Sequence, residues 1–88
     1  MKVTFIVRDL TAQAIDDLAA MDPRSAYAKL QKWAFGDLRH CVSVKFGNCD
    51  AFRDRVAWNG IFKSACPIAF AIEPRRGYRL VTFTEAPR

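Results

Sequence analysis

A chain of 88 residues is long enough for a single domain, residues 1–88, and too short for two. With 51% hydrophobic and 26% charged residues, its composition excludes a disordered or fibrous protein. Fourteen Lys and Arg against nine Asp and Glu give a net charge of +5, which favours partners with an acidic surface, nucleic acid included. A core of this size is modest, so pairing with a second copy in a homodimer could add stability.

The N-terminal residues have the pattern of a half-buried strand. Val3, Phe5 and Val7 recur at period two, which predicts that they share one face of a sheet. The apolar run around them is too short for a signal peptide, and no stretch approaches the roughly 18 apolar residues of a membrane helix. We therefore expect a cytoplasmic protein that does not engage a membrane.

Two amphipathic helices are predicted next, separated at Asp22-Pro23. Asp22 is a favourable N-cap, and Pro23 suits the first helical position because its missing N–H needs no partner there. Gly36 is expected to end the second helix in the left-handed conformation. The predicted buried stripes are Ala14, Ile15, Leu18, Ala19 and Met21 on the first helix, and Ala26, Tyr27, Leu30, Trp33 and Ala34 on the second.

A second strand is predicted over Cys41–Phe46, with Val42, Val44 and Phe46 on one face. The segment 50–58 fits two structures. Asp50 could cap a short helix that Asn59-Gly60 would stop, yet the same residues also alternate as a strand would. We favour the helix and keep the strand as the alternative.

The C-terminal part predicts a β-hairpin. Ile68, Phe70 and Ile72 alternate with small residues, Pro74 to Gly77 supply a turn, and Tyr78 to Thr84 return as a strand. We expect Glu73 to pair with Tyr78, which would place Phe70 opposite Val81 and Ile68 opposite Phe83.

Together these elements predict an α+β fold. It consists of an antiparallel sheet of about four strands, with two or three helices packed on one face, in the order β-α-α-β-(α)-β-β.

No residue set with catalytic spacing is visible. His40 is the single histidine, and Cys41, Cys49 and Cys66 lack the Cys-x-x-Cys spacing that structural zinc sites use. The four glycines are isolated, without the clustered spacing of a phosphate-binding loop. We therefore expect a protein that is not an enzyme, with no metal, no cofactor and reduced cysteines.

The segment Arg76–Phe83, with the sequence RGYRLVTF, places basic residues beside an aromatic-bearing strand. It resembles the aromatic octamer of the RNA recognition motif, and Phe5–Leu10 resembles the companion motif on that family's first strand. The resemblance implies bases stacked on a sheet beside arginines. Arg79 and Leu80 depart from the octamer, and Ile6 occupies the stacking position of the companion motif, so we do not assign the chain to that family.

Two hypotheses about function follow. The first is a small interaction protein that docks on a larger protein or nucleoprotein and inhibits or regulates it, as phage-encoded inhibitors of the anti-CRISPR type do. The second is a single-domain protein that binds RNA or single-stranded DNA with its basic, aromatic hairpin. The predicted partner-binding residues are Arg75, Arg76, Tyr78, Arg79, Lys63 and Arg53.

Overall fold

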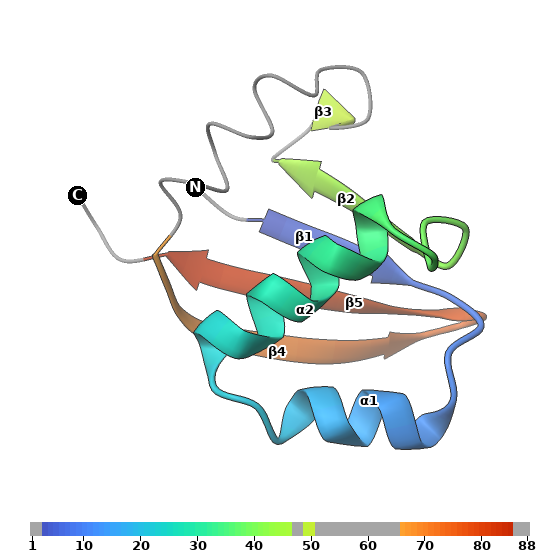
Figure 1. Cartoon of the computed structure of the whole chain (residues 1–88), viewed down its shortest axis with the longest axis horizontal. Helices are drawn as coiled ribbons and strands as arrows, with labels where there is room; N and C mark the ends of the chain where they lie inside the picture. Colours follow the sequence, from blue (N-terminus) through green and yellow to red (C-terminus); the bar gives the residue numbers. More distant parts are fainter. Residues whose placement is uncertain (1–2, 47–48, 51–65, 86–88) are drawn as a thin grey trace.

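The computed structural model describes residues 3–46, 49–50 and 66–85. These residues form an antiparallel sheet whose strands run in the order β3-β2-β1-β5-β4 (Figure 1). Helix α2 crosses one face of the sheet, and α1 lies along its β4 side. The elements are β1 (Val3–Val7), α1 (Ala12–Ala19), α2 (Pro23–Phe35), β2 (Val42–Phe46), β3 (Cys49–Asp50), β4 (Pro67–Arg75) and β5 (Tyr78–Glu85).

The α+β class and the antiparallel sheet are therefore confirmed. The described residues contain two helices, and the sheet gains a short strand, β3, which pairs with the end of β2. Asp50, expected to cap a helix, lies in β3 opposite Lys45. The rest of the segment expected to be a helix or a strand, residues 51–58, lies outside the described residues.

Strand β1 is the central strand of the sheet and pairs with β2 on one side and β5 on the other. Val3, Phe5 and Val7 are buried, and Thr4 and Ile6 between them are partly exposed. Phe5 lies opposite Val44 of β2 on one side and opposite Val81 of β5 on the other. Period-two patterning thus predicted the core face of this strand correctly.

Both helices begin at capped N-termini. The Thr11 hydroxyl accepts a hydrogen bond from the Ala14 N–H at 3.2 Å, and the Asp22 carboxylate accepts one from the Ser25 N–H at 3.3 Å. Hydrogen bonding from the Ser25 side chain, and secondly from its backbone N–H, lowers the pKa of Asp22, because both favour the charged carboxylate. The cap predicted at Asp22 is thereby confirmed.

The buried stripes are narrower than predicted. Ala19 is exposed, while Met21 and Trp33 are partly buried against the edge of the core. A helix presents only a limited arc to a sheet, so residues at the margin of the stripe remain partly in solvent. The helix residues that are buried are Ile15 and Leu18 of α1 and Ala26, Tyr27, Leu30 and Ala34 of α2.

Gly36 ends α2 for a different reason from the one expected. Its φ is −113°, so it is not in the left-handed region, and the prediction of that conformation was wrong. A Cβ at this position would lie 2.7 Å from the Lys32 carbonyl oxygen. Glycine is thus favoured here by the close approach of the backbone.

The pairing register of the hairpin is shifted by two residues from the predicted one. Arg75 pairs with Tyr78, so Glu73 lies opposite Leu80 and Phe70 opposite Phe83. The turn is tighter than expected, because Gly77 adopts a φ of +85° and allows the chain to reverse within Arg76-Gly77. Pro74 consequently belongs to β4, where an edge strand tolerates the missing N–H.

Ile68 does not belong to the apolar face predicted for it. The pairing of β4 with β5 shifts between Pro67 and Ala69, which takes Ile68 out of the alternation. Its side chain is 55% exposed, whereas Phe70 and Ile72 pack against the core. The expected pair of Ile68 with Phe83 is therefore absent.

An aromatic cluster joins the sheet to α2. The Phe83 ring lies 5.7 Å from Phe5, 4.9 Å from Tyr27 and 5.3 Å from Phe70, measured between centroids. The contacts with Phe5 and Tyr27 are edge-to-face, and the contact with Phe70 is stacked. The core thus lies between the sheet and the two helices.

Candidate functional site

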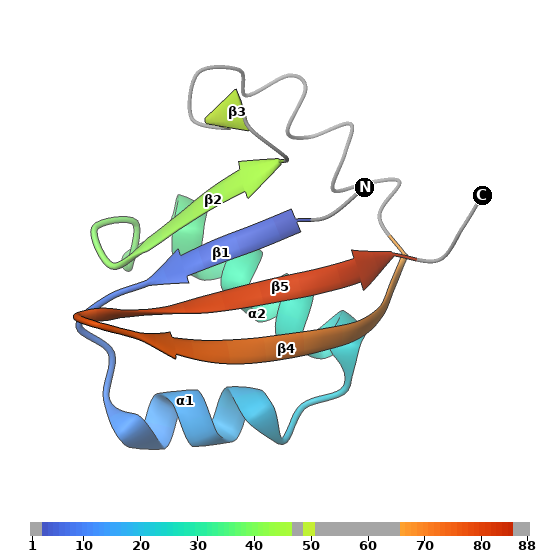
Figure 2. The ribbon, with the colours of Figure 1, turned by 180° about the vertical axis from the view of Figure 1, so that it is seen from behind.

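The face of the sheet opposite α2 is not covered by a described helix, as Figure 2 shows. Its side chains follow from strand alternation: because Val3, Phe5 and Val7 point toward the helices, Thr4 and Ile6 point away. We call this surface the open face. Its members are Thr4, Ile6 and Arg8, Ser43 and Lys45, Ala69, Ala71, Glu73 and Arg75, and Tyr78, Leu80, Thr82 and Thr84.

A hollow of about 470 Å³ lies on the open face. Ile6 and Leu80 are directly opposite each other on β1 and β5 and contribute apolar surface to it. The described residues that line the hollow are Thr4, Ile6, Arg8, Lys45, Tyr78 and Leu80.

The two cations of the hollow are separated along the strand direction. Lys45 lies opposite Thr4 of β1, and Arg8 is four residues beyond Thr4 in the sequence. At the usual rise per strand residue, Arg8 and Lys45 are therefore about 13 Å apart along the strand direction. Both cations are exposed. The open face therefore presents positive charge at two places with apolar surface between them.

Tyr78 lies toward the Arg8 end of this hollow. Arg79 is opposite Val7, so the register brings Tyr78 close to Arg8. The Tyr78 side chain is partly exposed. Its ring adds a flat, amphipathic surface next to a guanidinium group, a combination enriched at binding hot spots.

One acidic residue of the open face, Glu73, is already paired. Glu73 Oε2 accepts a hydrogen bond from Arg75 Nη2 at 2.6 Å, and Arg75 Nη1 also donates to the Pro74 carbonyl at 3.2 Å. This exposed ion pair contributes little to stability. It does compensate the negative charge of Glu73. Arg8 and Lys45 add positive charge to the open face, and Asp50 of β3 lies opposite Lys45 in the strand register.

The predicted partner-binding residues are not gathered in one place. Tyr78 lies in the hollow, Arg75 is engaged with Glu73, and Arg76 is exposed at the hairpin turn. Arg79 lies opposite Val7, on the side of the sheet that faces the helices. Lys63 and Arg53 lie outside the described residues.

The sequence interpretation overlooked Arg8 and Lys45. The alternation of β1 and β2 already placed Thr4, Ile6 and Lys45 off the core face. The sequence did not indicate the order of the strands in the sheet. In that order β5 is next to β1, so Tyr78 lies beside the end of β1.

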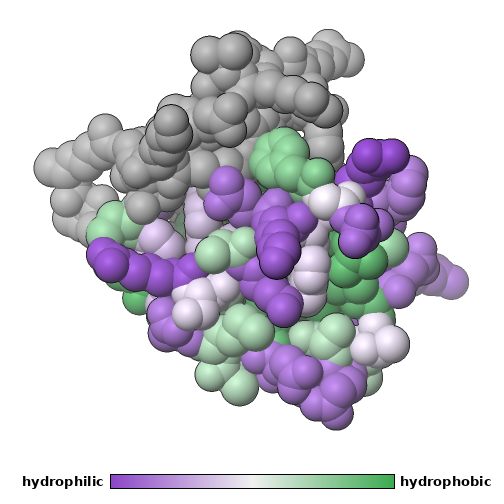
Figure 3. Space-filling model, in the orientation of Figure 1, coloured by the Kyte–Doolittle hydropathy of each residue, from purple (hydrophilic) through white to green (hydrophobic). Residues whose placement is uncertain are grey.

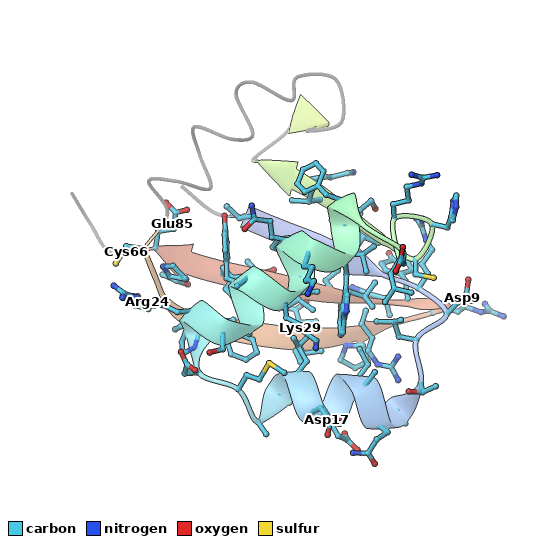
Figure 4. The ribbon with its side chains drawn as sticks, viewed as in Figure 1. Asp9, Asp17, Arg24, Lys29, Cys66 and Glu85 are labelled. Atoms are coloured by element: carbon cyan, nitrogen blue, oxygen red, sulfur yellow. The ribbon has the colours of Figure 1, made fainter. Side chains whose placement is uncertain are left out.

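The chemistry-bearing residues elsewhere do not form a reactive set in the described part of the chain. His40 is exposed in the turn after α2, and Cys66 accepts a 3.6 Å hydrogen bond from Arg24 at the opposite end of α2 (Figure 4). Within the described ranges, no group of three His, Cys, Asp or Glu residues could hold a metal ion. The side chain of Cys49 is not among those described.

The helix-bearing side of the molecule has a mixed surface, with hydrophilic and apolar residues interspersed (Figure 3). Lys29 Nζ lies 5.7 Å from the centroid of the Trp33 ring, beside a hollow of about 450 Å³ that also includes Asp37. The described lining of this hollow therefore carries charge of both signs.

None of the described helices is long and apolar enough to cross a membrane. In comparisons with known proteins, no family model, curated protein or solved structure matches this chain. The arguments about function below therefore rest on the geometry of the open face.

Proposed function

We propose that this protein is a small binding module, without catalytic activity, that docks through its open face on a larger protein or nucleoprotein with an acidic surface. The observation that carries the proposal is the hollow in which Arg8 and Lys45 flank the apolar pair Ile6 and Leu80. Inhibition or regulation of the partner follows if the docked module covers a surface that the partner needs.

The two parts of the hollow contribute differently to binding. The apolar pair and the Tyr78 ring supply area that is removed from water on docking, which favours association in proportion to that area. Arg8 and Lys45 attract an acidic partner and orient it, which raises the rate of association more than the affinity. Both contributions need a partner that combines negative charge with surface able to cover the apolar pair.

Docking is favoured over catalysis by the nature of the lining residues. Hydroxyl, aliphatic, phenol and cationic groups line the hollow, and among the described lining residues there is no carboxylate, histidine or cysteine. Those three are common general bases and nucleophiles. The hollow is therefore suited to recognition.

The proposal is tested with two variants that each lose two positive charges. Arg8→Gln/Lys45→Gln alters the open face, and Lys32→Gln/Arg39→Gln removes exposed cations from α2 and the turn after it. Each immobilised protein is used to capture partners from a lysate of the cells that naturally contain it. We expect the open-face variant to lose captured material that the control variant retains.

Equal capture by the two variants would show that general positive charge, and not the open face, retains the partner. The unfolding curves of both variants are measured first, since exposed substitutions should leave stability within about 0.5 kcal/mol of the parent.

A further inference from the structure

The arrangement of charge and flat apolar surface on the open face indicates which class of ligand binds there. This inference rests on the proposed function. Arg8 and Lys45 lie at two places about 13 Å apart along the strand direction. Ile6 and Leu80 lie between them, and the Tyr78 ring lies near Arg8. A matching ligand alternates negative groups with flat, weakly polar groups.

We infer that the open face binds a single strand of RNA or DNA, with a base against Tyr78 and phosphates near Arg8 and Lys45. A single strand offers this alternation, because each nucleotide carries one phosphate and one base whose faces are free to stack. A duplex offers phosphates at similar density but hides the faces of its bases. An acidic protein surface offers carboxylates without flat rings between them.

The surroundings of Tyr78 suit a stacking role. The residue lies on β5, whose backbone pairs with β4 along its length, so a stacked base would meet a ring held on a rigid element. Leu80 and Ile6 continue the surface beyond the ring and can contact a neighbouring base. The hydroxyls of Thr4 and Thr82, 3.5 Å apart on the same face, can donate to or accept from a base edge or sugar.

The charged groups of the face bear on the same ligand. Glu73, an acidic side chain that would repel a phosphate, is held by Arg75 at 2.6 Å, and Asp50 lies opposite Lys45 in the strand register. Arg8 and Lys45 are exposed, and phosphate oxygens are strong acceptors for both kinds of side chain. The contacts involve the backbone and base faces, so we expect weak dependence on nucleotide sequence.

The test measures binding of fluorescently labelled oligonucleotides by the purified protein, using single-stranded RNA, single-stranded DNA and a DNA duplex of the same length. We expect both single strands to bind more tightly than the duplex. Tyr78→Ala should weaken single-strand binding by about 5- to 100-fold, as expected for loss of one base–aromatic stack. Tyr78→Phe keeps the ring and should stay within about threefold of the parent.

The cations are tested by the salt dependence of the same binding. Arg8→Gln/Lys45→Gln should lower the slope of log affinity against log salt by about 1.4, since each phosphate contact on a single strand contributes about 0.7. The control variant Lys32→Gln/Arg39→Gln should change this slope by less than half as much. Both substituted pairs are exposed, so this measurement remains decisive if Tyr78→Ala fails to fold.

Three results would overturn the inference: unchanged binding by Tyr78→Ala, equal slopes for the two charge variants, or a duplex bound as tightly as the single strands. If oligonucleotides do not bind while lysate capture still requires Arg8 and Lys45 and survives nuclease, the partner is a protein. Docking then stands and the nucleic-acid inference fails. If neither assay depends on the open face, both proposals fail.

Discussion

At the scale of single residues, Tyr27 shows how burial changes the chemistry of a side chain. Its ring packs edge-to-face against Phe5 and Phe83, and 4% of the residue is exposed. Burial raises the pKa of the Tyr27 phenol because it disfavours the charged form, and the negative charge of Glu85 raises that pKa further. The folded state therefore keeps this phenol protonated at a pH where the unfolded chain would ionise it.

This difference predicts an alkaline loss of stability. Tyr27 has its ordinary pKa of 10.0 when unfolded and a higher one when folded, so its contribution is complete below about pH 10 and is lost as the pH rises above that value. We expect Tyr27→Phe to lose less stability than the parent between neutral pH and pH above 10. Denaturant unfolding at each pH measures the difference, and an equal alkaline loss in both proteins would contradict it.

At the scale of elements, the hairpin shows how one backbone irregularity redistributes side chains. Phe70 and Ile68 are two residues apart and would share a face in a regular strand. The shift in pairing between Pro67 and Ala69 keeps Phe70 against Phe83 and leaves Ile68 in solvent. The two residues should therefore differ sharply in what their side chains contribute to stability.

Phe70→Ala should lower the free energy of unfolding by about 2–5 kcal/mol, because it leaves a cavity beside Phe83. Ile68→Ala is the matched control from the same strand and should cost no more than about 0.5 kcal/mol, as exposed positions generally do. Urea unfolding of the two variants gives both values. Similar losses would mean that Ile68 is buried and that β4 has the regular alternation.

At the scale of the whole molecule, Phe83 connects elements that are distant in the sequence. It lies on β5 and contacts Phe5 of β1, Tyr27 of α2 and Phe70 of β4. Aromatic pairs of this kind contribute beyond the area that they bury. The helix layer and the sheet should therefore unfold together.

Phe83→Ala should lower the free energy of unfolding by about 3–5 kcal/mol while leaving a single transition. The parent and the variant are followed by far-ultraviolet circular dichroism, which reports secondary structure, and by near-ultraviolet dichroism, which reports aromatic packing. We expect the two signals to change at the same denaturant concentration in each protein. Loss of the aromatic signal before the helical one would show that the cluster does not couple the layers.

Local patterns in the sequence were sufficient for several features of this fold. The alternation in β1 and β2 predicted their core faces, and Asp22-Pro23 predicted the start of α2. Each of these depends on residues within a few positions of one another, through side-chain alternation or through a cap that bonds three residues ahead. The α+β class followed from the sequence of these elements.

Other features were decided by the tertiary structure. The hairpin register depended on the turn conformation at Gly77. Ile68 is exposed because the pairing of β4 with β5 is irregular beside it. Glycine is favoured at position 36 because the backbone approaches the Lys32 carbonyl closely there. The neighbours of β1 were likewise set by long-range pairing, which brings Tyr78 beside Arg8 and into the same hollow as Lys45. Alternation assigns a side chain to one face of a strand but does not indicate which distant strand lies beside it. The sequence by itself therefore determined the faces of the strands, and the tertiary structure decided which residues meet in the hollow of the open face.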